Sequence, residues 1–249
     1  MTQNPILKVL LTFRNHRVKC LLIGGQACII YGAAEFSRDS DFAVLCTPDN
    51  LELLRKALAS LKAGLIYFPA FEAAYLERGH ACHFRCAARG VKDLRVDILS
   101  RLRGCESFEE LWQRKNTISL ENGGKIDVIG LHDLVQSKKT QRDKDWWMLK
   151  RLVENDIILH QDNPSDDRIK WWFQESRNPQ RLVELAEQYP AMAKQSVAVR
   201  PLMSFAVTKN PQRLEAGLQD EERAERQKDM EYWTPLKREL ETLRHQKAA

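Results

Sequence analysis

Strand-like and helix-like patterns occupy different parts of this 249-residue chain. Short apolar runs bounded by turn residues, which indicate strands, occur between residues 18 and about 130. From about Ile157 onward, every periodic segment has apolar residues at helical spacing. This division predicts an α/β (α+β) fold, with a mixed β-sheet flanked by helices and an all-α C-terminal region. We place the boundary in a polar stretch, giving domains of residues 1–156 and 157–249.

Charge is distributed unevenly, although the net charge is only +5. Basic residues outnumber acidic ones by six to two both in 85–103 and in 138–151. Such segments suit a polyanionic partner, and they are equally consistent with a solvated surface. No apolar run approaches the roughly 20 residues that span a bilayer. The first residues also lack the basic start and cleavage site of a secretory signal. We therefore expect a cytoplasmic protein with no membrane partner.

Three residues of types that bind metals lie close together, at Cys82, His83 and Cys86. A zinc site is one interpretation, but the sequence has no second C-x-x-C or H-x-x-H pair to complete a tetrahedral set. The alternation in "HACHFRC" instead predicts a strand with Cys82, Phe84 and Cys86 on one buried face.

Local signals predict several element ends. Thr47 is expected to cap a helix that ends at Gly64. Ser107 and Glu110 have the spacing of a capping box. "NTISLENGGKIDVIG" indicates a β-hairpin that turns at residues 122–123.

The strand "VKCLLIGG" ends in Gly24 and Gly25, and a short helix follows. Backbone N–H groups at the start of a helix suit a phosphate group. The conformational freedom that a tight turn needs explains two glycines equally well.

Asp39 and Asp41 stand one residue apart at the start of the next strand. Residues at i and i+2 of a strand point to the same side, so Ser40 faces away from them. Two neighbouring carboxylates repel each other unless a cation lies between them. Mg²⁺ accepts such ligands where phosphates supply the rest. A pair of solvated turn aspartates is the alternative.

Asp97 interrupts the apolar strand "LRVDILS". A carboxylate in such a strand needs a partner or a metal. If this strand lies beside the strand of Asp39, three carboxylates converge, as two-metal phosphoryl or nucleotidyl transfer requires. Asp97 would then also be the candidate general base.

These motifs have a recognisable order. G-G-x-A, a short helix, S-x-D-x-D before a hydrophobic residue, and a later strand aspartate resemble the DNA-polymerase-β-like nucleotidyltransferase superfamily. "LVQSKKTQRDKDWWMLKRL" is similar to the K-x-x-x-R-x-K-D segment of stand-alone bacterial members, including AbiEii-type toxins and minimal nucleotidyltransferase relatives. The resemblance covers roughly residues 18 to 155.

The resemblance implies a nucleotidyltransferase-type sheet and a set of site residues. Asp145 is implied as a supporting partner of the basic residues in 138–151. Either Lys138 or Lys139 could be the lysine that points toward the nucleotide. The implied catalytic residues and metal ligands are Asp39, Asp41 and Asp97, and the implied nucleotide-binding residues are Gly24, Gly25, Ser37, Lys138, Arg142 and Lys144.

The implied reaction is Mg²⁺-dependent (or Mn²⁺-dependent) transfer of NMP from ATP or another NTP to an acceptor hydroxyl, with release of pyrophosphate. The implied acceptor is an RNA end, for example a tRNA-like one, or a protein or small molecule; an antitoxin partner is also implied. The alternative is a non-catalytic nucleotide-binding module of a toxin–antitoxin-like system. A metal-dependent nuclease is less favoured, because it does not need the glycine pair.

Two positions depart from the family pattern. Many members have Gly-Ser where this chain has Gly24 and Gly25. The arginine that is frequent two residues before the Ser or Thr is replaced by Glu35. Because this residue lies near the mouth of the site in the family, replacing the cation by an acid leaves the preferred acceptor undetermined.

Overall fold

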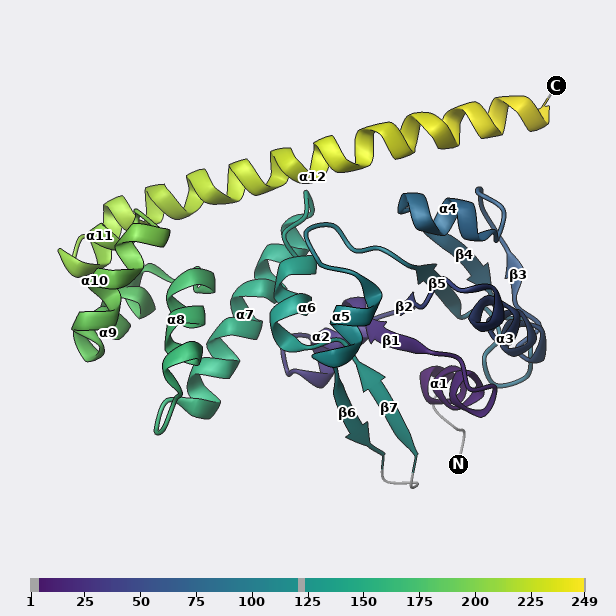
Figure 1. Cartoon of the computed structure of the whole chain (residues 1–249), viewed down its shortest axis with the longest axis horizontal. Coiled ribbons are helices and arrows are strands. Elements are labelled where there is room, and N and C mark those ends of the chain that lie inside the picture. The colour runs from purple at the N-terminus through teal and green to yellow at the C-terminus, as the bar shows by residue number, and fades with distance from the viewer. Residues whose placement is uncertain (1–4, 121–123, 249) are drawn as a thin grey trace. The chain divides into compact units, whose positions relative to one another are not determined.

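The computed structural model describes residues 5–120 and 124–248, without the side chains of 246–248 (Figure 1). The strands are β1 (Cys20–Ile23), β2 (Asp39–Val44), β3 (Gly64–Leu65), β4 (Cys82–Arg85), β5 (Arg95–Leu99), β6 (Asn116–Ser119) and β7 (Lys125–Val128). The helices are α1 (Pro5–Asn15), α2 (Gly24–Ile30), α3 (Pro48–Ser60), α4 (Ala73–Arg78), α5 (Phe108–Gln113), α6 (Leu131–Ser137), α7 (Asp143–His160), α8 (Asp166–Glu175), α9 (Pro179–Gln188), α10 (Pro190–Val199), α11 (Met203–Val207) and α12 (Pro211–Ala248).

The strands form one mixed sheet in the order β3-β4-β5-β2-β1-β7-β6. β2 is parallel to β5 and antiparallel to β1, and β5 is antiparallel to β4. The predicted mixed α/β sheet with a helical C-terminal region is thus confirmed. The strand of Asp97, β5, also lies beside the strand of Asp39 and Asp41, β2, which is the condition under which the three aspartates converge.

Contacts divide the chain into two compact units, Met1–Ser137 with Glu231–Ala249, and Lys138–Met230. The first unit contains the sheet, and its core includes Phe13 and Phe42, whose ring centroids lie 4.8 Å apart. The second unit is helical and buries Trp172 and Phe173 completely. The predicted domain boundary between residues 156 and 157 falls within α7 and stays a prediction.

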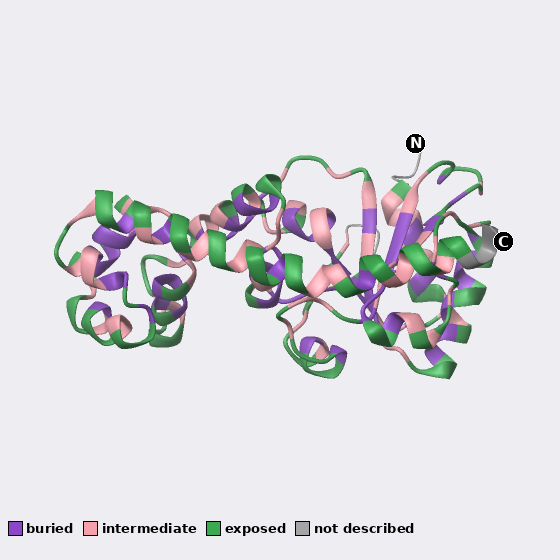
Figure 2. Cartoon of the chain, turned by 90° about the horizontal axis from the view of Figure 1, so that it is seen from above, coloured by how far each residue is buried: buried purple, intermediate pink, exposed green. Residues whose placement is uncertain are grey.

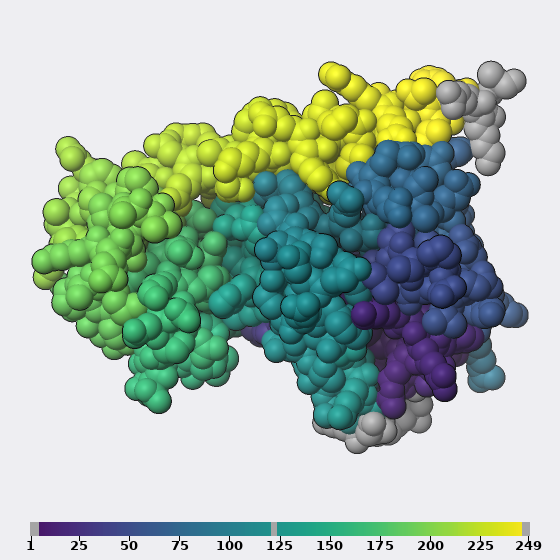
Figure 3. Space-filling model, in the orientation of Figure 1, coloured from purple at the N-terminus to yellow at the C-terminus, as the bar shows by residue number. Residues whose placement is uncertain are grey.

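Burial follows the elements of each unit. Buried residues run along the strands and along one side of most helices (Figure 2). In the second unit, helices α8–α11 pack into a continuous cluster (green in Figure 3). No helix in the described part of the chain combines the length and apolar character needed to cross a membrane.

Most local predictions are confirmed. Thr47 caps α3 through the amide of Asn50, and Ser107 and Glu110 form a complete capping box on α5. The expected end of α3 at Gly64 is wrong. The helix ends at Ser60, because the chain turns through a left-handed Lys62 (φ 48°), and Gly64 already lies in β3. Strands β6 and β7 pair as a hairpin. Its turn residues 122–123 lie outside the described residues.

The cysteines follow the strand interpretation. Cys82, Phe84 and Cys86 are all buried. Burial, with a smaller effect of Cys46, raises the pKa of Cys82 to about 12, and burial raises that of Cys86 to about 11. Such buried thiols are protonated at neutral pH and pack as small apolar side chains.

Candidate active site

The glycine pair lies where β1 ends and α2 begins. Gly24 has a φ of +67°, a conformation that costs a non-glycine residue energy. A Cβ atom on Gly24 would stand 2.0 Å from Oδ2 of Asp41, and one on Gly25 would stand 2.5 Å from Oγ of Ser37. The turn therefore needs glycine for close approach as well as for backbone freedom. It brings four of the predicted site residues into contact.

Gly24→Ala is expected to lower the free energy of unfolding by about 1–2 kcal/mol, the cost of a left-handed alanine. It should also turn the carboxylate of Asp41 away, because its new Cβ overlaps Oδ2. Urea unfolding measures the first effect. Gly64→Ala is the control, because its φ is not in the left-handed region and no heavy atom lies within 4 Å of its Cβ position. Equal stability of the two variants would contradict the prediction.

Asp39 and Asp41 project from the same side of β2. Asp41 pairs in register with Ile23 of β1 on one side and with Asp97 of β5 on the other. Both aspartates are half-buried. Ser40 faces the opposite side and is fully buried, as its position between the two predicts.

The hydroxyl of Ser40 has no hydrogen-bond partner among the described residues. A buried polar group without a partner costs about 1–3 kcal/mol, so Ser40→Ala is expected to raise the free energy of unfolding by about 1 kcal/mol. Ser100 is the matched control. It is also buried, but its Oγ donates to the carbonyl of Leu76 at 2.5 Å, so Ser100→Ala should be destabilising. Chemical denaturation of both variants measures the sign, and a loss of stability in Ser40→Ala would refute the prediction.

Asp97 already has two side-chain partners, Arg95 and His83. Arg95 Nε donates to its Oδ1 at 2.7 Å, and Nδ1 of His83 lies 2.8 Å from the same oxygen. Nδ1 of His83 also lies 3.0 Å from Nη2 of Arg95. One nitrogen cannot donate to the carboxylate and accept from the guanidinium at once, so the tautomer of His83 selects the contact. Burial raises the pKa of Asp97, but the bonds and charges of His83 and Arg95 outweigh it and hold that pKa below its ordinary value.

Arg95 and His83 were not among the predicted site residues. Arg95 stands two residues before Asp97 in the same strand, so alternation alone puts both on one face. His83 reaches Asp97 only through the register of β4 with β5, which pairs the two residues. The need of a buried carboxylate for a partner is thus met by two side chains. The role of Asp97 as a metal ligand stays a prediction.

The donor set suits a hard divalent cation. Mg²⁺ is commonly held by one or two carboxylates together with substrate phosphates, rather than by a cage made only of protein. Asp39 and Asp41 supply two carboxylates on one side of β2, beside a glycine turn with no Cβ atoms. Among the described residues, no group of three or more His, Cys, Asp or Glu side chains is arranged to hold a metal by itself.

The predicted basic segment belongs to the second unit. Asp145, which is 1% exposed, accepts hydrogen bonds from Lys138 Nζ at 3.1 Å, Thr140 Oγ1 at 2.7 Å and Arg142 Nε at 2.7 Å. Burial raises the pKa of Asp145, but the charges of Lys138 and Arg142 and the bond from Thr140 lower it below its ordinary value. Asp145 therefore holds Lys138 and Arg142 in place, and its implied supporting role at a nucleotide site stays a prediction.

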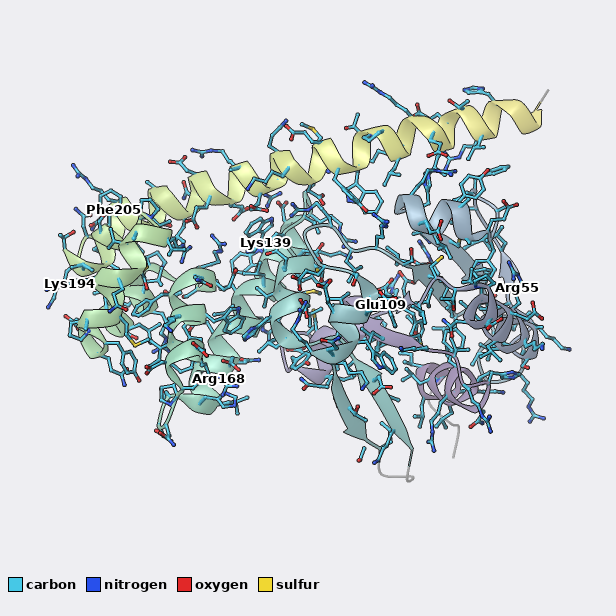
Figure 4. All side chains as sticks on the ribbon, viewed as in Figure 1. Arg55, Glu109, Lys139, Arg168, Lys194 and Phe205 are labelled. Carbon is cyan, nitrogen blue, oxygen red and sulfur yellow. The ribbon has the colours of Figure 1, made fainter. Side chains whose placement is uncertain are left out.

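The two competing lysines have different partners. Lys138 pairs with Asp145, whereas Nζ of Lys139 lies 2.9 Å from Oε1 of Glu175. Lys139 is labelled in Figure 4. Lys144 is exposed on the first turn of α7. Binding of a nucleotide by Lys138, Arg142 and Lys144 stays a prediction.

The chain was compared with family models, curated proteins and solved structures. No family model matches the chain, and no curated protein matches it in sequence. Among solved structures, the chain is similar to a "putative nucleotidyltransferase" from H. pylori, at 13% identity and a TM-score of 0.41. The match covers 92% of this chain and 95% of that one.

Proposed function

We propose that the chain is a Mg²⁺-dependent nucleotidyltransferase that transfers NMP from an NTP to an acceptor hydroxyl. One observation carries the proposal: the glycine turn after β1 lies against the carboxylate of Asp41, which is itself in register with Asp97. A place for phosphate oxygens and a set of carboxylates thus meet at neighbouring strand ends. The glycine turn alone and the aspartates alone each have a simpler explanation. Their contact supports the proposal that together they bind a triphosphate and its metal ion.

In this reaction the acceptor oxygen forms a bond to the α-phosphorus, and the bond from that phosphorus to the bridging oxygen breaks. Pyrophosphate leaves with the electron pair, and the hydroxyl proton passes to a base. Asp39 and Asp41 would hold Mg²⁺, which, when bound, neutralises phosphate charge and lowers the pKa of the attacking hydroxyl. Asp97, ionised at neutral pH, is the candidate to receive the proton, and Arg95 and His83 fix its orientation.

The remaining residues bind and orient the nucleotide. Gly24 and Gly25 would turn their backbone N–H groups, at the start of α2, toward phosphate oxygens, and the Ser37 hydroxyl lies at the same turn. Lys138, Arg142 and Lys144 belong to the second unit, and their binding of triphosphate charge stays an expectation from the sequence. The AbiEii-like subfamily, the antitoxin partner and the cytoplasmic location stay expectations from the sequence.

A label-transfer experiment tests the proposal. The purified chain is incubated with each α-labelled NTP, Mg²⁺ and either total RNA or cell lysate. We expect label to appear on an acceptor only when Mg²⁺ is present. If the chain binds NTP but transfers label to no acceptor, the proposal that it is a nucleotidyltransferase is refuted. That result would favour the second candidate, a non-catalytic nucleotide-binding module. The occupation of Asp97 by Arg95 and His83 is the observation that favours this candidate.

A further inference from the structure

The face of the sheet that carries the aspartates changes character beyond Asp97. Register places His83 beside Asp97, Arg95 beside Asp39, and Arg85 beside Arg95, so all of them share that face. The face is acidic on β2, mixed on β5 and basic on β4. An aromatic residue, Tyr67, adjoins the basic end. We call Tyr67, His83, Arg85 and Arg95 the aromatic–arginine patch.

Tyr67 is held in place while its ring stays accessible. The amide of the preceding Ile66 donates to the carbonyl of His83 at 2.9 Å, which ties this segment to β4. The ring centroid lies 5.8 Å from that of His83, edge to face, and 5.9 Å from Cζ of Arg95. Tyr67 is nevertheless 52% exposed. A fixed aromatic ring beside arginines is the arrangement with which proteins stack unpaired bases.

The order of the strands indicates from which side of the aspartates the acceptor approaches. In phosphoryl transfer the attacking and leaving oxygens lie roughly in line. The proposed phosphate turn follows β1, the aspartates stand on β2 and β5, and β4 comes next. If the leaving pyrophosphate lies on the β1 side, the acceptor must approach from the β4 side. Two strand spacings, roughly 10 Å, separate β4 from β2, a distance suited to a neighbouring nucleotide.

We infer that the aromatic–arginine patch is the acceptor subsite, and that the acceptor is the end of a single-stranded nucleic acid. Its terminal base stacks on Tyr67, and its backbone phosphate pairs with the exposed Arg85. This inference rests on the proposed function. A polycationic small molecule is disfavoured by two arginines on this face, and a protein hydroxyl brings no base for Tyr67.

Binding of a short 5′-fluorescein-labelled single-stranded oligoribonucleotide to the full chain, measured by anisotropy without NTP, tests the subsite. Tyr67→Ala is expected to weaken binding about tenfold or more, as loss of one stacked base does. Tyr67→Phe should retain binding. Arg85→Ala should weaken it and lower the slope of log K against log salt by about 0.7, which corresponds to one phosphate contact.

Tyr75→Ala is the matched control, because Tyr75 also lies against an arginine and a histidine, Arg78 and His80, but on α4. It should bind the oligonucleotide like the unaltered chain. NTP affinity, measured separately by calorimetry, should be unchanged in Tyr67→Ala. No binding by the unaltered chain, or equal loss in Tyr67→Ala and Tyr75→Ala, would overturn the inference. Loss of NTP affinity in Tyr67→Ala would also overturn it, by placing the NTP base on Tyr67.

Failure of the subsite differs from failure of the proposed function. If label transfer occurs and Tyr67→Ala leaves the KM for the oligonucleotide unchanged, the subsite is wrong and the enzyme stands. The opposite result is also possible: Tyr67→Ala loses oligonucleotide binding, but the unaltered chain transfers no label. The aromatic–arginine patch then binds nucleic acid, and the proposed nucleotidyltransferase reaction is wrong.

Discussion

Asp41→Asn is expected to reduce NMP transfer by about 10³-fold or more. A bound cation supplies several kcal/mol of charge stabilisation at a reacting phosphate, and each ~1.4 kcal/mol is tenfold in rate. Asparagine keeps the shape of the side chain but has no charge with which to hold the cation. The initial rate of label transfer at saturating NTP and Mg²⁺ measures the loss. Asp39→Asn should behave alike, because both aspartates project from one side of β2.

The loss should not come from unfolding. Asparagine has the same shape as aspartate, so we expect Asp41→Asn to fold, and its thermal midpoint checks that the loss of transfer is not a loss of structure. Weakened Mn²⁺ binding, followed by electron paramagnetic resonance, gives a readout independent of turnover. Asp49→Asn is the control, since Asp49 is exposed in the first turn of α3. A purified, folded Asp41→Asn protein that transfers label at the original rate would rule out the proposed function.

Features of the fold that depend on neighbouring residues could be predicted from the sequence. The caps at Thr47 and Ser107 are confirmed because each is decided within three or four residues. Alternation in β2 put Asp39 and Asp41 on one side for the same reason. The end of α3 was missed because left-handed Lys62 is unusual for a residue with a side chain, and only the surrounding packing enforces it.

Features that depend on strand order could not be predicted. The contact of Gly24 with Asp41 requires β1 and β2 to be antiparallel neighbours with one particular register. The same holds for His83 beside Asp97, where a shift of one residue would turn the histidine to the other face. The sequence alone named the three aspartates but gave only a condition for their convergence. It also could not show that His83, from β4, lies against Asp97.

Asp145→Ala is expected to lower the free energy of unfolding by about 3–5 kcal/mol, the cost of breaking a buried ion pair by removing one partner. Lys138 is 5% exposed, and its charge would remain buried without the carboxylate at 3.1 Å. The bonds from Thr140 and Arg142 to the same carboxylate would be lost as well. Urea denaturation followed by circular dichroism measures the change.

Acid should reveal the same interaction. Because the folded pKa of Asp145 is lowered, its contribution is complete above the ordinary Asp pKa of about 3.9 and is lost as the pH falls through the folded value. The stability of Asp145→Ala should therefore fall less steeply below about pH 4 than that of the unaltered chain. The comparison isolates the buried carboxylate from the exposed ones.

Asp143→Ala is the matched control on the same helix turn. The Asp143 side chain is 87% exposed and pairs with Arg226 at 2.7 Å, so its loss should cost at most about 1 kcal/mol. Adding Lys138→Met to Asp145→Ala should recover part of the stability, because the uncompensated charge is then gone. If Asp143→Ala and Asp145→Ala cost the same, or if Lys138→Met recovers nothing, the buried pair does not hold this segment in place. The basic segment would then need another source of order before it could orient a triphosphate.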